Sequence, residues 1–138
     1  MVKIRLAKLL DCKFCAILSK IQELKLANGE FISINYFKNF LDKDKMFLVA
    51  EEKKKIIGYI LGEPMKGKIA HLGLLTVDNK FRNQGIGNQL VNKFDDQCKK
   101  KGIKNILLYA PKFNKKTLNF YKKLGFQKGK EHIQFLKD

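Results

Sequence analysis

The segment of this chain that is best equipped for chemistry joins an apolar run to the start of a helical pattern. It reads Leu-Leu-Thr-Val-Asp-Asn-Lys-Phe-Arg-Asn-Gln-Gly-Ile-Gly over residues 74–87. Backbone N–H groups at a helix start lack partners within the helix, and the helix dipole leaves partial positive charge there. Gly85 and Gly87 let an anion approach that backbone closely, and Lys80 and Arg82 add formal charge. The spacing fits a phosphate cradle, and it fits equally a glycine pair that only serves a turn.

Two motifs in register resemble one known family. Residues 82–87 match the Arg/Gln-x-x-Gly-x-Gly/Ala signature of the GNAT superfamily of N-acetyltransferases. Asn114, followed by Leu-Asn-Phe-Tyr-Lys-Lys-Leu-Gly-Phe at 118–126, resembles the family's Asn…Tyr-x-x-x-Gly-Phe motif. The segment 71–87 also resembles the arylalkylamine N-acetyltransferases. The likeness extends over residues 2–137 and predicts the family's fold.

The resemblance implies acetyl-CoA as the acyl donor and no metal. The pantetheine arm of acetyl-CoA would lie where the strands at 69–77 and 103–110 splay apart, and the N–H of Val77 would donate a hydrogen bond to the thioester carbonyl. The glycine-rich stretch would wrap the pyrophosphate, and Asn114 would reach the pantetheine. The residues expected to bind the cofactor are Leu75, Val77, Arg82, Asn83, Gln84, Gly85, Ile86, Gly87, Asn114 and Tyr121.

The resemblance also assigns candidate catalytic groups. Tyr121 matches the family's general acid, which would protonate the departing thiolate; without the motif it would be interpreted as a core residue of an amphipathic helix. His71 matches the first of two strand histidines that relay a proton in arylalkylamine enzymes, but Gly73 takes the place of the second. The base is therefore open between His71, Tyr109 and a water chain. An unperturbed imidazole titrates in the range that suits proton transfer at neutral pH.

Hydrophobic periodicity predicts the elements that hold these residues. Strand patterns fall at 2–6, 46–50, 56–61, 69–77 and 103–110, and a closing pair is expected within 126–136. Helical patterns run from Asp11 to the Asn28-Gly29 stop, behind a Ser33 cap, from 85 to 101 and from 114 to 124. We therefore expect one α/β domain over residues 1–138, with a mixed sheet of about seven strands flanked by four helices.

Composition narrows the class of protein. The 138 residues are 45% hydrophobic, so the chain can bury a core, and they carry a net charge of +16. Residues 68–138 hold 16 basic and 5 acidic residues, a balance that suits an anionic partner or reflects lysine-rich composition. No run approaches the length of a membrane span and no signal peptide is recognisable, so we expect a cytoplasmic protein. Three cysteines make no disulfide framework, and we interpret Cys12 and Cys15 as small helix residues.

The acceptor is the least determined part of the prediction. We expect an N-acetyltransferase acting on a primary amine of a small molecule, in a site shaped by residues 28–33 and by the lysine-rich stretch 128–130. Glu30 is the acid of that first loop that could attract an ammonium group. Two alternatives stay open: a macromolecular amine, on protein or aminoacyl-tRNA, and a non-enzymatic module that binds CoA or nucleic acid. The chain is expected to be a monomer or a homodimer.

Overall fold

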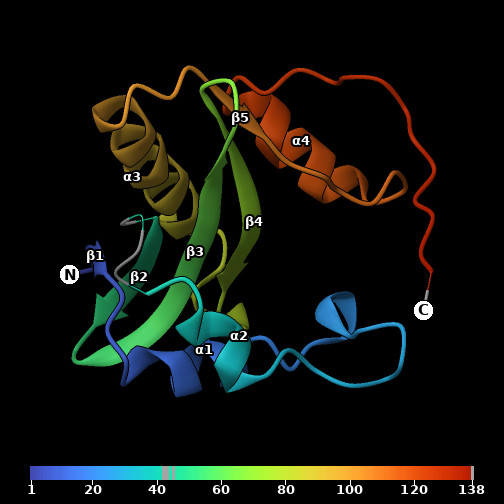
Figure 1. Cartoon of the computed structure of the whole chain (residues 1–138). Helices are drawn as coiled ribbons and strands as arrows, with labels where there is room; N and C mark the ends of the chain where they lie inside the picture. The colour runs from blue at the N-terminus through green and yellow to red at the C-terminus, as the bar shows by residue number, and fades with distance from the viewer. Residues whose placement is uncertain (42–43, 45, 138) are drawn as a thin grey trace. The chain divides into compact units, whose positions relative to one another are not determined.

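The computed structural model describes residues 1–41, 44 and 46–137, which fall into two compact units, Met1–Leu108 and Tyr109–Asp138. Figure 1 labels their helices and strands. The first unit contains, in chain order, β1 (Lys3–Leu6), α1 (Asp11–Leu18), the 3-10 turn η1 (Gln22–Leu24), α2 (Ile34–Lys38), β2 (Phe47–Glu52), β3 (Lys55–Met65), β4 (Ile69–Val77), the 3-10 turn η2 (Asn79–Phe81), α3 (Ile86–Lys100) and β5 (Asn105–Leu107). The second unit contains α4 (Lys115–Lys123).

The sheet runs in the order β1-β2-β3-β4-β5. Its first four strands pair antiparallel, and β5 joins β4 in parallel. This confirms the mixed sheet, and the part of the chain that the structure describes also contains the four α-helices expected. The long strand β3 lies between β2 and β4 and is the middle of the sheet, as the two green ribbons at the centre of Figure 1 show for β3 and β4.

Each face of the sheet packs on a different set of helices, because successive residues of β3 point to opposite sides. Tyr59 is fully buried on the face covered by α1 and α2. The ring of Phe37 packs edge-on against it, with the ring centroids 5.3 Å apart. On the other face α3 presents Leu90 and Phe94, both fully buried. Phe94 comes so close to β3 that only the missing side chain of Gly62 makes room for it.

The prediction of about seven strands was wrong: the described residues form five, and 126–137 carry no strand. Within that segment Ile133, Phe135 and Leu136 are 81%, 88% and 79% exposed. A hairpin that buries no apolar face is marginal in water, and the alternation of these residues alone cannot stabilise one. The strand expected at 103–110 is also shorter, since β5 ends at Leu107.

The first helix begins at Asp11, as predicted, but it ends at Leu18 and is shorter than its periodicity predicted. Asp11 does not cap α1; the cap position is Leu10, and the Asp11 carboxylate instead accepts the N–H of Lys8 at 2.8 Å. At the other end, the Ser19 hydroxyl donates to the Cys15 carbonyl at 2.7 Å and contacts the Tyr59 hydroxyl at 2.6 Å. This buried tertiary contact replaces the next helical turn. The Ser33 cap of α2 is confirmed, since its hydroxyl accepts from the N–H of Tyr36.

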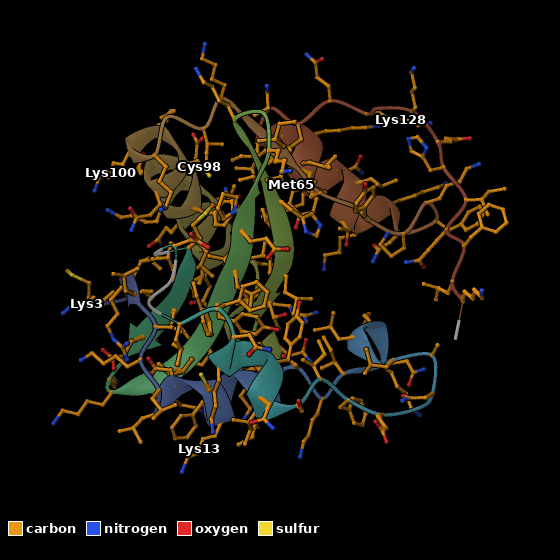
Figure 2. All side chains as sticks on the ribbon, in the orientation of Figure 1. Lys3, Lys13, Met65, Cys98, Lys100 and Lys128 are labelled. Carbon is orange, nitrogen blue, oxygen red and sulfur yellow. The ribbon has the colours of Figure 1, made fainter. Side chains whose placement is uncertain are left out.

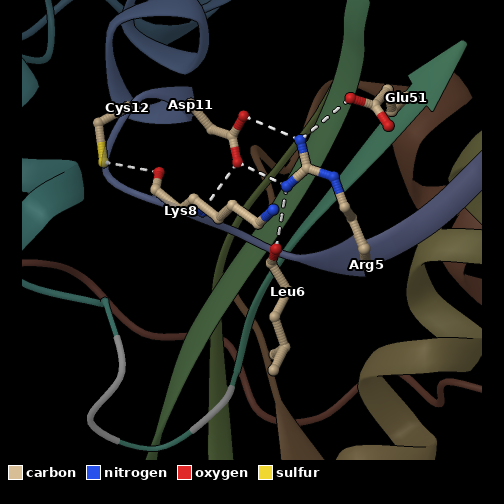
Figure 3. Close-up of polar contacts among 6 residues, drawn as sticks. All are labelled: Arg5, Leu6, Lys8, Asp11, Cys12 and Glu51. Atoms are coloured by element: carbon tan, nitrogen blue, oxygen red, sulfur yellow. Dashed lines mark hydrogen bonds and ion pairs between the residues drawn. The ribbon is translucent and has the colours of Figure 1, made fainter. Parts of the chain in front are cut away.

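A partly buried ion-pair cluster ties α1 to the sheet, as Figure 3 shows. Both guanidinium N–H groups of Arg5 reach the Asp11 carboxylate, at 2.7 and 3.0 Å, and one also reaches Glu51 at 3.2 Å. Arg5 comes from β1, Asp11 from the first turn of α1 and Glu51 from β2. The cluster therefore joins three elements at one point.

The cysteines are buried and unpaired, and the lysines lie mostly on the surface. Cys12, Cys15 and Cys98 are buried free thiols, and burial raises the pKa of each. Lysine side chains extend outward from the ribbon; Figure 2 labels Lys3, Lys13, Lys100 and Lys128. Most of the positive charge is thus carried on the surface.

Candidate active site

The sheet has an opening along β4. Its parallel pairing with β5 covers Ile69, Ala70 and His71 and ends at the pair His71–Leu107, whereas β4 continues to Val77. Between 72 and 77 this edge of β4 has no ladder partner among the residues that the structure describes. Free backbone groups on a strand edge can hydrogen-bond an extended ligand in the way a further strand would.

The backbone groups that face this edge can be identified. The N–H of Asp78 donates to the Ile57 carbonyl at 2.8 Å, so it points toward β3. Because successive residues of a strand point their backbone groups to opposite sides, those of Val77 and Leu75 face the open edge. The Val77 carbonyl there accepts the Nε–H of Arg82 at 3.0 Å. The N–H of Val77 points to the same side, and within the described chain no group accepts a hydrogen bond from it.

A bulge precedes the open edge. The register of β3 with β4 shifts between the pairs Leu61–Leu74 and Gly62–Leu72, which leaves Gly73 as the extra residue. Such a bulge bends a strand and disrupts its pairing. The bend comes where the β4–β5 ladder ends.

The loop from β4 to α3 presents a row of backbone donors. Asn83 and Gly85 have left-handed backbone, with φ of 64° and 80°, and Gly85 is the cap of α3. In the described part of the chain no group accepts the N–H of Asn83, Gln84 or Gly85. A row of free N–H groups at a helix start suits an anion. Lys80 and Arg82 are exposed beside it.

Three buried hydroxyl groups support the end of β4 on the face of the sheet that α1 and α2 cover. The Thr76 hydroxyl donates to the Tyr59 hydroxyl at 3.2 Å, and Tyr59 lies 2.6 Å from the Ser19 hydroxyl. Since the proton of Ser19 is used on the Cys15 carbonyl, Tyr59 is the donor to Ser19. Burial raises the pKa of Tyr59 to about 12. Because Thr76 directly precedes Val77, these hydrogen bonds among the three hydroxyls hold β4 in place beside its open edge.

His71 lies on the face of the sheet that α1 and α2 cover, half-buried and directly opposite Glu63 of β3. Glu63 is not among the predicted site residues, because the strand predicted at 56–61 ends before it. Past Leu61, β3 pairs only with β4, so Pro64, which has no N–H, is tolerated there. A signal was present: Glu63 is the only acid between residues 53 and 77.

The other predicted residues lie in the second unit. Asn114 caps α4, its side chain accepting the N–H of Thr117 at 3.2 Å. Tyr121 lies two turns further along α4 and packs edge-on against Phe120 and Phe126. Burial raises the pKa of Tyr121 to about 12. Tyr109 is 73% exposed at the start of this unit.

The structure thus brings together His71, Leu75 and Val77 on β4 and places the segment 82–87 directly after them, while Asn114 and Tyr121 share α4. Residues 1–41, 44 and 46–137 contain no group of three or more His, Cys, Asp or Glu that could hold a metal ion. No helix of the described chain is long and apolar enough to cross a membrane.

A family model and curated relatives match this chain. The model described as the acetyltransferase (GNAT) family matches residues 14–126. An uncharacterized N-acetyltransferase of Methanocaldococcus jannaschii is 33% identical over 99 residues, which cover 67% of this chain and 44% of that protein. The chain spans less than half the length of the curated relatives it matches.

Solved structures share the fold. A transcriptional regulator from Bacillus halodurans superposes with a TM-score of 0.82 at 25% identity, covering 99% of this chain and 100% of that one. The ribosomal-protein-S18-alanine N-acetyltransferase of Escherichia coli has a TM-score of 0.79 at 19% identity, with 94% and 80% covered. An aminoglycoside N-acetyltransferase in complex with CoA has a TM-score of 0.80 at 16% identity, with 99% and 95% covered.

Proposed function

Because this chain belongs to the acetyltransferase (GNAT) family, we propose that it transfers the acetyl group of acetyl-CoA to a primary amine of a small molecule. The observation that carries the proposal is the open edge of β4, with the backbone of Leu75 and Val77 facing it, followed at once by the donor row at 83–85. One stretch of chain thus offers donors for an extended amide-bearing arm and then for a phosphate.

Each cofactor-binding residue has a role in this proposal. Leu75 and Val77 bond the pantetheine through their backbones. The segment 82–87, with the Arg82 side chain, binds the pyrophosphate, and Asn114 contacts the pantetheine through its amide. The residues fit such a ligand because the N–H groups at 83–85 have no acceptor among the described residues.

Acetyl-CoA supplies an activated acetyl group, and the chain's own residues guide the protons and charge. The N–H of Val77 donates to the thioester carbonyl oxygen as negative charge develops on it. The acceptor nitrogen must first lose a proton, because a primary ammonium has a pKa of about 10. His71 is the proposed base, directly or through water, with Tyr109 as the alternative. Tyr121 holds the proton for the leaving sulfur; with a pKa raised to about 12 by burial, its phenol stays protonated at neutral pH.

Other acceptors and roles have support of their own. One fold neighbour acts on an alanine of ribosomal protein S18, another on aminoglycosides, and a third is titled a transcriptional regulator. A macromolecular acceptor is therefore the second candidate. A non-enzymatic module is disfavoured, because a binder has no use for a tyrosine at the family's acid position.

The test follows the acetyl group. Purified protein is incubated with radiolabelled acetyl-CoA and a cell extract separated into small-molecule, protein and RNA fractions. We expect label in the small-molecule fraction, and we expect Tyr121→Phe to lower the rate about 100-fold at unchanged acetyl-CoA affinity, since general acid catalysis contributes about that much. Tyr109→Phe tests the alternative base in the same unit; a fall in the rate of that variant would assign the proton chemistry to Tyr109.

Label in protein or RNA would transfer the proposal to a macromolecular acceptor. If no fraction is labelled although the protein binds acetyl-CoA, the proposal that this chain is an enzyme is overturned.

A further inference from the structure

Six lysines gather where the turn between β3 and β4 meets the end of α3 and the start of β5. The backbone holds these segments together, because the N–H groups of Lys104 and Asn105 both donate to the Lys68 carbonyl, at 2.9 and 3.3 Å. Figure 1 shows the β3–β4 turn and the last turn of α3 at the same end of the first unit. The members of this group, which we call the lysine cap, are Lys66, Lys68, Lys99, Lys100, Lys101 and Lys104.

The positive charge of the lysine cap is largely uncompensated. All six side chains are exposed. Lys99 is paired with Asp95 at 3.1 Å, and among the residues that the structure describes no ion pair involves the other five lysines. Residues 64–77 and 97–108 contain no acidic residue, whereas the lysines of the β2–β3 turn directly follow two glutamates. The cap is therefore a surface that attracts anions.

The lysine cap is separate from the candidate cofactor site. Lys68 and Lys104 lie beside Ile69, the first residue of β4, whereas the donor row at 83–85 follows Val77, its last residue. A strand of nine residues is about 26 Å long, at about 3.3 Å per residue. At physiological salt, exposed charges that far apart are screened from one another. A phosphate bound at the donor row therefore leaves the charge of the cap unused.

The composition of the cap favours phosphates over a protein or a membrane as its partner. Apart from lysine, the segments 66–68 and 99–104 contain two glycines and Ile103. Protein interfaces depend on aromatic and arginine side chains, and stable membrane binding needs an apolar anchor in addition to basic charge. A lysine ammonium is a flexible point charge, which suits phosphates spaced along a backbone. Without aromatic rings, these segments cannot stack the bases of a single strand.

We infer that the lysine cap binds the phosphate backbone of a nucleic-acid duplex and does not read its sequence. The inference goes beyond the proposed function and does not rest on it. A DNA duplex carries one negative charge for about every 1.7 Å of its axis, so several lysines of the cap can reach phosphates at once. Each lysine that neutralises a phosphate releases a condensed counterion, and this release drives binding.

Fluorescence anisotropy of the full chain with a labelled DNA duplex of mixed sequence, about 20 base pairs or two helical turns long, tests the inference. Five phosphate contacts predict that log K falls with log salt at a slope of about −4.5 between about 50 and 200 mM salt. A second duplex of unrelated sequence should bind equally, and the single strand more weakly. A slope near zero, or tighter binding of the single strand, would overturn the inference.

An RNA duplex of the same sequence identifies the source of the phosphate backbone. DNA and RNA duplexes share the charge that the cap recognises, so tight binding of either supports the inference. The duplex that binds more tightly is the one assigned to the cap.

The cap variant Lys66→Gln/Lys68→Gln/Lys104→Gln removes three of the unpaired charges. It should lower the affinity for the duplex at least about tenfold at about 100 mM salt. The slope should become about −2, because each lost phosphate contact reduces its size by about 0.9. Thermal unfolding should match that of the wild type, since all three side chains are exposed.

The matched control is Lys53→Gln/Lys54→Gln/Lys55→Gln, which removes the same charge from exposed lysines at the other end of β3. It should change the slope by less than about 0.5, because none of these lysines belongs to the cap. Equal losses of affinity in the two variants would mean that net charge alone attracts the duplex, and they would overturn the inference.

Competition separates the cap from the cofactor site. Saturating acetyl-CoA should leave the duplex bound, because the donor row at 83–85 follows the other end of β4. Displacement of the duplex would locate it at the cofactor site and overturn the inference. A protein that binds the duplex through the cap but does not bind acetyl-CoA would refute the proposed function and leave the inference standing.

Two other anionic probes test the choice of partner. Phosphatidylserine–phosphatidylcholine vesicles represent a membrane, and polyglutamate represents an acidic protein. Both should bind more weakly than the duplex, because the cap offers them neither an apolar anchor nor aromatic contacts. Tighter binding of either probe, lost in the cap variant, would assign the cap to that partner and overturn the inference.

Discussion

Arg5 shows how much of this architecture depends on one side chain. Its guanidinium satisfies two carboxylates and also donates to the Leu6 carbonyl at 3.1 Å. Asp11 is 6% exposed, so its charge is buried and has to be compensated. Burial alone raises the pKa of Asp11, but the bonds from Arg5 and from the N–H of Lys8 outweigh it, and the net shift is downward.

Asp11→Asn should therefore lower the free energy of unfolding by about 2–3 kcal/mol at pH 7, because it leaves Arg5 without its closest partner. A carboxyl with a depressed folded-state pKa stabilises the fold above its unfolded pKa of about 3.9, and this is lost as pH falls through the folded-state pKa. The difference between wild type and variant should narrow below about pH 4. Urea unfolding at pH 7, 5 and 3 measures it.

The matched control is Asp95→Asn, which breaks the exposed Asp95–Lys99 pair of α3 at 3.1 Å. That change should cost less than about 0.5 kcal/mol. Equal losses in the two variants would mean that the Arg5 cluster is worth no more than a surface pair.

At the scale of elements, the close approach of α3 to β3 and β4 depends on glycine. A Cβ at Gly62 would overlap the His71 carbonyl oxygen and lie 2.6 Å from Cζ of Phe94. At Gly58 it would lie 3.0 Å from the Thr76 carbonyl oxygen. Both glycines face α3, so they set how closely that helix packs beside the bulge and the opening of β4.

Gly62→Ala should destabilise the protein by about 2–3 kcal/mol, because backbone and an aromatic ring must both move. Gly58→Ala should cost less, and Gly129→Ala, where a Cβ meets nothing within 4 Å, should cost almost nothing. Thermal unfolding of the three variants tests this order. A stable Gly62→Ala protein would show that α3 packs more loosely than described.

At the scale of the whole molecule, hydrogen bonding is distributed unevenly. β3 is paired on both sides over 58–61, whereas in 127–137 the described residues make no backbone hydrogen bond. Local opening costs little where few bonds and contacts have to break. The end of the chain should therefore exchange its amide protons far faster than the sheet.

Hydrogen exchange on the full chain should show residues 127–137 unprotected within seconds and the amides of β3 protected for hours or longer. Protected amides at 133–136 would mean that the alternation of Ile133 and Phe135 forms a strand in solution after all. The amides of α4 serve as the internal reference for helical protection in the same unit.

Much of the fold was predictable because its signals are local. The start of α3 at Gly85, the Ser33 cap and the amphipathic spacing of α3 depend on neighbours within a few residues, and each is confirmed. The residues of the β4–α3 segment were predictable too, since strand, loop and helix start are consecutive in the chain. Their binding roles stay a prediction.

The sequence alone determined the family, the mixed sheet and the order of strand, loop and helix start from Leu75 to Gly87, because these depend on motif spacing and local periodicity. The tertiary structure decided what depends on partners far along the chain. The Tyr59 hydroxyl ends α1 at Leu18, unpaired alternation at 126–136 forms no strand, and the β3–β4 register extends β3 past Pro64. That register sets Glu63 opposite His71, and cross-strand pairing is invisible in a linear pattern because it joins residues by hydrogen bonds rather than by spacing.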